Sequence, residues 1–118
     1  MKMVIAIIRP ERLEAVEASL RAVLDEGEAY RITTDSVEGH GRQGGEVEMF
    51  RGREVQVHTV HRTRLTICVN DAYLDRTIDA IVRAARTGTG AVGDGKIFVL
   101  PLEEVVRIRT GERGGRAI

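Results

Sequence analysis

The feature that most constrains the fold is an apolar run near the start of the chain, Met3 to Ile8. The run is continuous rather than alternating, and most of its residues are β-branched. This pattern is typical of a central strand that is covered on both faces. Pro10 follows two residues later and suits the first turn of a helix. The chain must therefore place its first strand inside a sheet and continue from that strand into a helix.

Two amphipathic helices and three further strands are predicted downstream. The first helix should end near Gly27, and Asn70 or Asp71 should cap the second. The expected buried faces are Leu13, Val16, Leu20, Val23 and Leu24 in the first helix, and Leu74, Ile78, Ile81, Val82 and Ala85 in the second. The later strands are expected at Arg31 to Glu38, Arg62 to Val69 and Lys96 to Leu100. The order strand, helix, strand, strand, helix, strand predicts a single α+β domain over residues 1–118 with a ferredoxin-like βαββαβ fold.

Charge and length exclude several classes of function. The 118 residues include 18 basic and 18 acidic side chains, a balance that argues against nucleic-acid binding. The apolar run at the start is too short to span a membrane, so we expect no membrane insertion and a cytoplasmic protein. Both helices should cover one face of the sheet. The other face needs cover as well, and in so small a chain a second copy is the natural candidate.

A glycine-rich stretch between the second helix and the last strand is the first candidate site. It reads TGTGAVGDGKIF from Thr87, and from Gly90 it contains G-x-x-x-x-G-K. A nucleotide-hydrolysing P-loop follows a strand and opens a helix, whereas here a helix precedes and a strand follows. Ile97 also replaces the hydroxyl residue that binds magnesium. The protein is therefore not expected to be an enzyme. Residues of about 87–96 form either a phosphate-binding loop, in which Lys96 adds a positive charge, or an ordinary flexible connection.

Two other segments are candidates for function. Arg107 and Arg109 are two residues apart, so in an extended chain both would point the same way, and paired guanidinium groups suit polyphosphate. The alternative is a solvated basic tail over about 107–118. The stretch from Gly39 to about His58 is rich in glycine and charge. So long a loop in a small domain is usually functional or mobile.

These motifs together resemble the signature of the PII nitrogen-regulatory signal-transduction family. The resemblance rests on T-G, G-D-G-K-I-F-V and R-I-R-T-G-E, and it covers nearly the whole chain. Gly39 to Gln43 resembles the G-x-G-R-Q that opens the family's effector loop, the T-loop, and Phe50 to Val55 resembles its Y-R-G-x-E-Y. The resemblance implies a compact homotrimer of ferredoxin-like subunits. Such proteins bind ATP or ADP in clefts between subunits, take up 2-oxoglutarate together with ATP and magnesium, and do no chemistry of their own.

The resemblance also implies roles for individual residues. Nucleotide contacts are implied for Ile7, Thr33, Gly39, Gly41, Arg42, Gly93, Asp94, Gly95, Lys96, Arg107 and Arg109. The last two arginines would reach the phosphates across the subunit boundary. Gln43 matches the residue that helps to hold magnesium and 2-oxoglutarate, and its amide oxygen is a hard ligand.

The effector loop, about 42–58, is expected to be flexible and to dock on a protein partner through Phe50, Arg51 and Glu54. Arg51 matches the arginine that, in relatives that bind ammonium transporters, plugs the channel exit. An ammonium transporter or a nitrogen-assimilation enzyme is therefore a candidate partner. Val55 and Phe50 stand where relatives carry loop tyrosines, so tyrosyl modification of the loop is not expected.

The chain departs from the family pattern at the effector site and in the phosphate loop. Arg62 stands where relatives carry the lysine that meets 2-oxoglutarate, and Gly44 replaces the lysine after Gln43. A sensor of nucleotide alone, or of another small anion such as bicarbonate, is therefore the main alternative, and a slow ATPase is a third. The doubled T-G also lengthens the phosphate loop by two residues. Thr87 keeps the preceding helix in register, so the insertion is placed after it.

Overall fold

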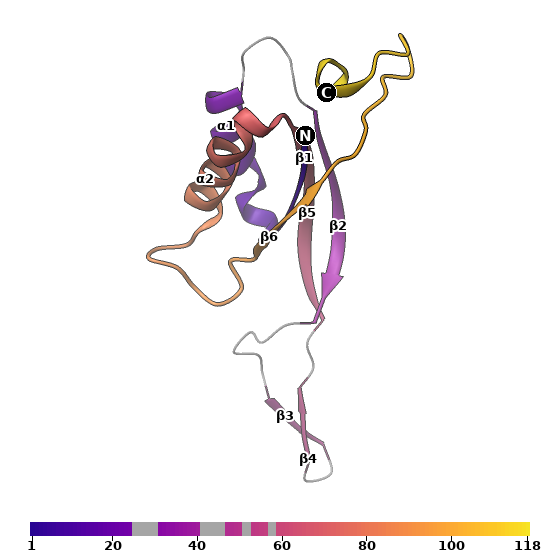
Figure 1. The fold of residues 1–118 in the computed structure, drawn as a ribbon. Coiled ribbons are helices and arrows are strands. Elements are labelled where there is room, and N and C mark those ends of the chain that lie inside the picture. The colour runs from indigo at the N-terminus through magenta and orange to yellow at the C-terminus, as the bar shows by residue number, and fades with distance from the viewer. Residues whose placement is uncertain (25–30, 41–46, 51–52, 57–58) are drawn as a thin grey trace.

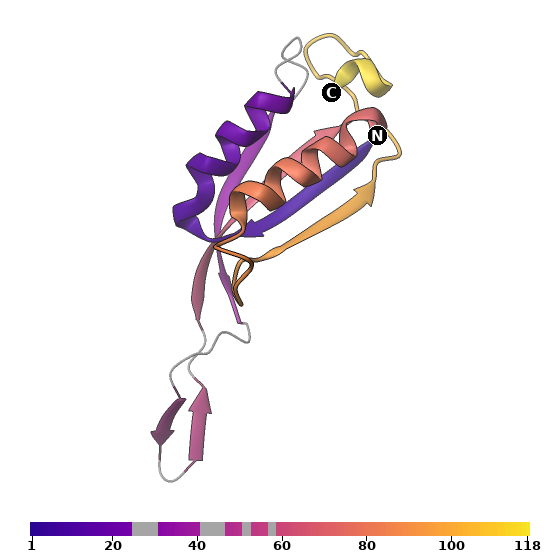
Figure 2. The ribbon, with the colours of Figure 1, turned by 90° about the vertical axis from the view of Figure 1, so that its left-hand side faces the viewer.

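The protein is a four-stranded antiparallel sheet with two helices packed on one face (Figures 1 and 2). The computed structural model describes residues 1–24, 31–40, 47–50, 53–56 and 59–118. The strand order is β2-β5-β1-β6, with β1 at Lys2–Ile8, β2 at Ile32–Gly39, β5 at Val60–Val69 and β6 at Lys96–Pro101. The first strand pairs on both sides, as its apolar run predicts. The predicted ferredoxin-like fold is confirmed.

Each helix begins with a short 3-10 turn. Pro10–Arg12 leads into α1 at Leu13–Leu24, and Asp71–Tyr73 leads into α2 at Leu74–Ala85. The predicted side-chain cap before α2 is wrong. Asn70 occupies the cap position, but its side-chain oxygen accepts no hydrogen bond from the turn; its Nδ2 instead donates to the carbonyl of Gly115 at 3.1 Å. The side-chain amide of Asn70 therefore contacts the C-terminal segment and not the helix that it was predicted to cap.

The hydrophobic core lies between the sheet and the helices. It is made by Val4, Ala6, Ile8, Val16, Leu20, Leu24, Leu65, Ile67, Val69, Ala80, Ile81 and Ala85. Alternate residues of β1 and β5 point into it, in register, so that Val4 faces Ile67 and Ala6 faces Leu65. Two polar residues, Thr63 and Thr77, are also buried, and the hydroxyl of Thr77 donates to the carbonyl of Tyr73 at 2.7 Å.

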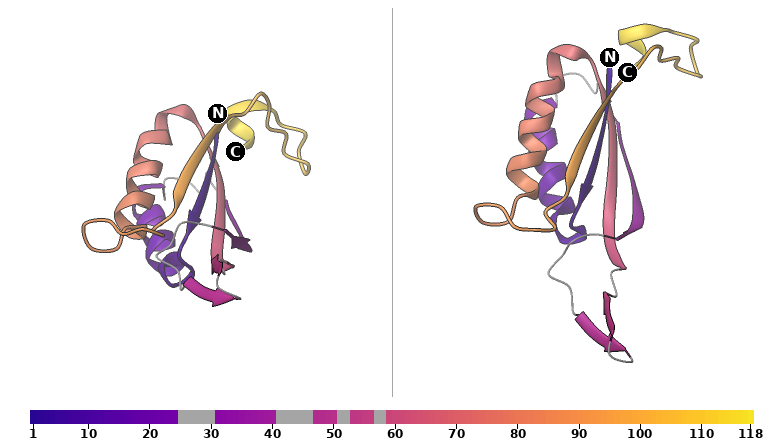
Figure 3. Two further views of the ribbon diagram at one scale, coloured as in Figure 1. Left: turned by 90° about the horizontal axis from the view of Figure 1, so that it is seen from below. Right: turned by 60° about the horizontal axis from the view of Figure 1, so that its bottom comes forward.

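The other face of the sheet has no helix over it in the described part of the chain (Figure 3). We call it the open face. Phe98 and Leu100 on β6 are 50% and 44% exposed, large values for such apolar side chains. On the same face, Arg64 on β5 donates two hydrogen bonds to the carboxylate of Asp35 on β2, from Nε at 3.0 Å and from Nη2 at 2.5 Å. The open face thus has the mixed character of a surface that another chain would cover.

The effector loop contains a short hairpin that the sequence does not predict. Strands β3 at Val47–Phe50 and β4 at Arg53–Gln56 pair antiparallel and form a sheet of their own beyond the ends of β2 and β5 (Figure 1). Each strand has 4 residues, too few for an alternation of apolar and polar residues to stand out. Its backbone pairing makes this loop partly regular.

Candidate functional site

The loop between α2 and β6, residues 87–95, is the centre of the candidate site, and we call it the phosphate loop. Helix α2 closes when the N–H of Arg86 donates to the carbonyl of Val82 at 3.1 Å. The chain then turns through four glycines with positive φ angles, namely Gly88, Gly90, Gly93 and Gly95. Such angles are strained for residues with a side chain, so the loop has its shape because these positions are glycine.

The carboxylate of Asp94 organises the phosphate loop from within. Its Oδ2 accepts the N–H of Thr87 at 3.0 Å and the N–H of Ala91 at 2.8 Å. Its Oδ1 accepts the hydroxyl of Thr87 at 2.6 Å and Nε of Arg9 at 3.2 Å. These donors, those of Ala91 and Thr87 foremost, hold the pKa of the Asp94 carboxyl well below its usual range. Sequence reasoning expected Asp94 at the phosphates and missed this role inside the loop.

The same contacts bear on the doubled T-G. Thr87 makes two hydrogen bonds to Asp94, whereas Thr89 makes no polar side-chain contact within the described residues. A threonine that anchors the aspartate must come from the first T-G. These contacts support the placement of the two extra residues after Thr87.

Gly95 ends the phosphate loop in direct contact with β1. A Cβ atom at this position would lie 1.7 Å from the carbonyl oxygen of Ile7. Only glycine fits so close to a neighbouring backbone. Lys96 follows, pairs with Ile7 across the sheet and is exposed. Its ammonium group makes no ion pair or hydrogen bond with any described residue, so it remains available for an anion.

A cavity of about 340 Å³ lies between α2, the end of the sheet and the phosphate loop. Its lining is mainly apolar, and three charged residues contribute to it. The lining residues are Ile7, Ile8, Ile78, Ile81, Val82, Ala85, Arg86, Asp94, Gly95, Lys96 and Ile97. The loop therefore stands beside an apolar hollow with cationic side chains, an arrangement suited to an anion with an apolar part.

The strand register brings three of the other expected residues, Ile7, Thr33 and Arg62, to the open face. Lys96 pairs with Ile7, and Ile7 pairs with Arg64, so these residues share one row and one face. By the same alternation, Thr33 and Arg62 point to that face. Arg62 is half-buried, and its Nη1 donates to the carbonyl of His61 at 2.9 Å. Residues far apart in the sequence therefore share one surface.

Of the expected residues in and beside the effector loop, Gly39 is fully described: it is the last residue of β2, and its backbone pairs with Val60. Gly41, Arg42, Gln43 and Arg51 lie outside the described residues. Phe50 and Glu54 lie in β3 and β4, for which the backbone alone is described.

The second arginine-bearing segment is a tight hairpin over residues 104–113, the C-terminal hairpin. Val106 and Arg113 form a bridge, and the N–H of Gly111 donates to the carbonyl of Arg107 at 2.7 Å. Arg107 and Arg109 therefore do not lie in the extended chain in which both side chains would point the same way. Residues 108–110 form a turn, which Gly111 closes with a φ of 73°.

The two arginines of the hairpin have different environments. Arg107 is held by its own chain, because Nη1 donates to Glu112 Oε1 in the hairpin and Nη2 donates to the carbonyl of Arg116 just after it, both at 3.0 Å. Arg109 is exposed and has no polar partner among the described residues. Beside it, Ile108 is 99% exposed. The turn thus presents a cation and an apolar side chain that nothing in the described chain contacts.

The phosphate loop and the C-terminal hairpin lie at opposite ends of β6 (Figure 2). The strand has 6 residues, which corresponds to a length of about 17 Å. One chain therefore does not bring Arg107 or Arg109 to the phosphate loop. An arrangement in which both act on one ligand needs a second chain.

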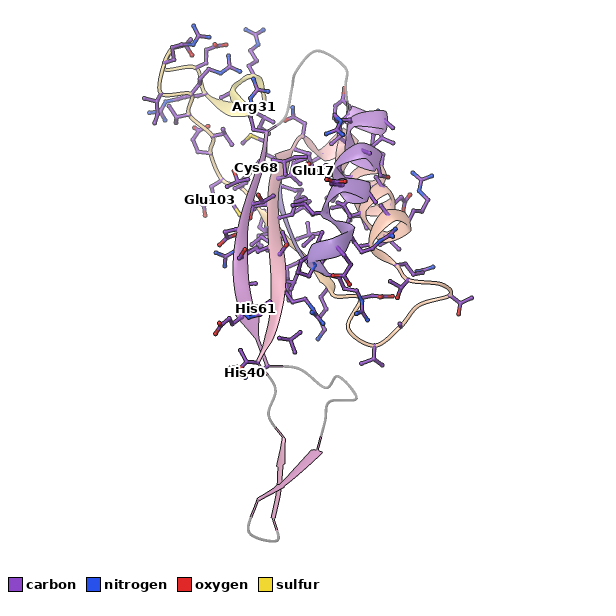
Figure 4. All side chains as sticks on the ribbon, turned by 180° about the vertical axis from the view of Figure 1, so that it is seen from behind. Glu17, Arg31, His40, His61, Cys68 and Glu103 are labelled. Atoms are coloured by element: carbon purple, nitrogen blue, oxygen red, sulfur yellow. The ribbon has the colours of Figure 1, made fainter. Side chains whose placement is uncertain are left out.

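The described residues contain neither a candidate metal-binding cluster nor a helix that could span a membrane. No group of three or more His, Cys, Asp or Glu residues there could hold a metal ion. His40 and His61 are exposed, and Figure 4 shows them at the end of the sheet from which the effector loop departs. Of the described helices, none is long and apolar enough to cross a membrane.

Comparison with known proteins places this architecture in a family. The sequence model described as nitrogen regulatory protein P-II matches residues 1–112. The chain is 48% identical to nitrogen regulatory protein GlnK1 of Methanosarcina mazei, over 100% of the chain and 97% of that protein. It is 45% identical to nitrogen regulatory protein P-II 2 of Methanothermobacter thermautotrophicus, over 100% and 97%. It is 46% identical to nitrogen regulatory protein P-II of Azospirillum brasilense, over the full length of both. The chain belongs to the P-II family of nitrogen regulatory proteins.

Proposed function

We propose that this P-II family member senses ATP and ADP at a site shared between two copies of the chain. The phosphate loop of one copy would hold the phosphates, and the C-terminal hairpin of a neighbour would complete the site. The observation that carries the proposal is the separation of a preformed loop from an unpartnered Arg109 by the length of β6. The nucleotide state would then be signalled to a nitrogen-metabolism partner.

The phosphate loop offers hydrogen-bond donors of the right kind. In the described chain the N–H groups of Gly93 and Gly95 make no hydrogen bond, whereas the N–H of Asp94 donates to the carbonyl of Ala91 at 3.1 Å. Free N–H groups in a glycine turn bind phosphate oxygens, and Lys96 adds a positive charge. Asp94 would act by shaping the loop, because four donors already engage its carboxylate.

The open face supports assembly into a homotrimer. It carries Ile7, Thr33, Arg62 and Lys96 together with the exposed side chain of Phe98. If this face packs against other copies, the apolar surface is removed from water and the expected nucleotide residues lie at the boundary between subunits. Assembly of the subunits would then bury the open face and complete the nucleotide site at the same time.

Arg62 is the described residue best suited to 2-oxoglutarate. It lies on the open face shortly after the end of the effector loop, and one of its nitrogens, Nη1, donates to the carbonyl of His61. The remaining N–H groups can bind a carboxylate with two parallel hydrogen bonds. Magnesium would accompany ATP, with Gln43 as its expected protein ligand. The alternative is that the protein responds to nucleotide alone or to a small anion such as bicarbonate.

The effector loop would carry the signal to the partner. Its hairpin, β3 and β4, lies beyond the sheet, where a partner can reach it (Figure 1). Phe50, Arg51 and Glu54 are the expected contact residues. The partner class is an ammonium transporter or a nitrogen-assimilation enzyme, reached from the cytoplasm.

Isothermal titration with ATP and with ADP tests the proposal directly. Both should bind, and Lys96→Ala should weaken binding by roughly 1.5–3 kcal/mol, the contribution of a charge-assisted contact. An absence of binding by both nucleotides at millimolar concentration would overturn the proposal. A further titration of 2-oxoglutarate in the presence of ATP and magnesium separates the two effector hypotheses, since tight binding would exclude the nucleotide-only sensor.

A mixing experiment tests whether two chains share the site. Lys96→Ala impairs the loop and Arg109→Ala impairs the hairpin, so each variant alone should bind weakly. After random exchange of subunits in an equal mixture, about a quarter of the sites should combine an intact loop with an intact hairpin. Tight binding should return at those sites. If the site lies within one chain, mixing restores none.

A further inference from the structure

We propose that Arg9 is the positioning residue of the phosphate loop, an inference that rests on the proposed nucleotide function. Arg9 lies 85 residues before Asp94 in the chain, and its Nε donates to Asp94 Oδ1 at 3.2 Å. Its Nη2 donates to the carbonyl of Val92 at 2.9 Å. One side chain thus holds both the organising carboxylate and the backbone of the loop.

Arg9 is itself firmly held. It follows the last residue of β1 and precedes Pro10, and its carbonyl accepts the N–H of Arg12 at 3.0 Å. The side chains of Arg9 and Asp94 are 23% and 17% exposed, so their ion pair is largely shielded from water. A guanidinium group that is shielded from water and makes two hydrogen bonds holds the phosphate loop in place more firmly than a solvated surface ion pair would.

The contact with Val92 explains how a lengthened loop keeps its shape. Val92 lies in the stretch lengthened by the two extra residues, and its side chain is 70% exposed, so packing does little to hold it. Asp94 can restrain Thr87 and Ala91, but its carboxylate does not contact Val92. Within the described chain, the guanidinium of Arg9 supplies the side-chain hydrogen bond to this part of the loop.

Arg12 provides a matched control. It lies in the same turn and also reaches the α2 side of the molecule, but its Nε donates to the carbonyl of Ala84 at 2.8 Å, before the loop begins. Loss of Arg12 should affect the end of α2, whereas loss of Arg9 should affect the phosphate loop. The comparison separates positioning of the loop from general support of the fold.

The test uses the full chain and three variants, Arg9→Gln, Arg9→Lys and Arg12→Gln. The first measurement is hydrogen exchange of residues 87–95 and of α2 without nucleotide. The second is the affinity for ATP, ADP and adenosine by titration. Lysine keeps the charge at position 9 but carries its donors on one nitrogen instead of on the planar fork that Arg9 uses, so Arg9→Lys reports how much depends on geometry.

We expect exchange at the Thr87 and Ala91 amides to quicken about tenfold in Arg9→Gln, with α2 unchanged. Affinity for ATP and ADP should fall by about tenfold, while affinity for adenosine, which has no phosphate, should stay the same. Arg9→Lys should lie between wild type and Arg9→Gln in both measurements, and Arg12→Gln should keep wild-type loop exchange. If Arg9→Gln does not fold, intermediate values for Arg9→Lys still support the inference.

Two outcomes would overturn the inference. One is wild-type exchange of residues 87–95 in both Arg9 variants. The other is a wild-type protein that binds ATP or ADP and an Arg9→Gln variant that binds it equally well. If the wild type binds neither nucleotide but the loop exchange changes as expected, the proposed function fails and the positioning of the loop by Arg9 stands.

Discussion

The phosphate loop and the C-terminal hairpin lie at the two ends of β6. Both contain glycine turns, and an arginine side chain hydrogen-bonds to each, yet different interactions hold them in place. The carboxylate of Asp94 binds the phosphate loop from inside, and Gly95 lies against the backbone of β1. The hairpin is closed mainly by its own main chain, through the bond from Gly111 to Arg107 and the bridge from Val106 to Arg113. It turns Ile108 and Arg109 outward.

Under the proposed function, this difference corresponds to a binding site divided between subunits. The loop is complete within one chain, with the Asp94 carboxylate engaged by four donors and the N–H groups of Gly93 and Gly95 free of hydrogen bonds within the described residues. The hairpin has a definite shape but no ligand or partner for Arg109 in the described chain. A loop that must bind phosphate benefits from being preformed, since ordering on binding would reduce affinity. A cation that must act on a neighbour has to stay free in its own chain.

Gly95→Ala should have the largest effect, because it breaks the phosphate loop where it meets the sheet. The new Cβ would lie 1.7 Å from the oxygen of Ile7, so either the loop or β1 must move. We expect the free energy of unfolding to fall by about 3 kcal/mol or more, with loss of nucleotide binding. Chemical denaturation and titration measure both.

Gly88→Ala is the matched control for that substitution. Gly88 has a φ of 57°, but a Cβ there would meet nothing within 4 Å. The cost should be about 1 kcal/mol, the ordinary penalty of a left-handed residue with a side chain. Equal effects of the two substitutions would contradict the close approach at Gly95.

Arg109→Ala tests the other half of the comparison. Affinity for ATP should fall by about 1.5–3 kcal/mol because a charge-assisted phosphate contact is lost. The free energy of unfolding should change by less than about 0.5 kcal/mol, because Arg109 has no partner in the described chain. Arg113→Ala is the control on the same hairpin, since Arg113 faces Glu104 at 3.5 Å instead. Loss of stability without loss of affinity would refute the assignment.

Asp94→Asn tests the internal contacts of the phosphate loop through the pH dependence of stability. Because its pKa is lowered in the folded protein, the Asp94 carboxylate stabilises the fold above its unfolded pKa of about 3.9. That stabilisation is lost as pH falls from there toward the lower folded pKa. Asp94→Asn should therefore lower the melting midpoint by ~5 °C at pH 7, and the gap from wild type should narrow below about pH 4. A gap that is constant down to pH 2.5 would argue against the network.

Glu112→Gln should have the smallest effect. The ion pair between Arg107 and Glu112 is about 36% and 44% exposed, so solvent screens it. We expect a loss of about 0.5 kcal/mol or less in unfolding experiments, because main-chain bonds close the hairpin. A loss of 2 kcal/mol would mean that the ion pair, rather than the backbone, holds the hairpin.

The sequence was sufficient for the two helices and for the four strands of the main sheet. The apolar run of β1, Pro10 at the first turn and the helical spacing of Val16 and Leu20 predict elements that the structure contains. The same local reasoning failed where a distant segment intervenes. Asn70 bonds Gly115 instead of making a side-chain cap for α2. Residues 108–110 form a turn closed by the hydrogen bond from Gly111 to Arg107, so Arg107 and Arg109 do not share an extended chain.

The ferredoxin-like order, the place of the phosphate loop and the family could all be predicted from the sequence alone. Each of these depends on patterns within short windows, such as periodicity or G-D-G-K. Only the tertiary structure decided that Asp94 shapes the loop, that Arg9 contacts it from 85 residues away, and that Arg109 stands apart from it. Such contacts depend on how β1, α2 and β6 pack, because hydrogen bonds act over about 3 Å and no local pattern encodes that proximity.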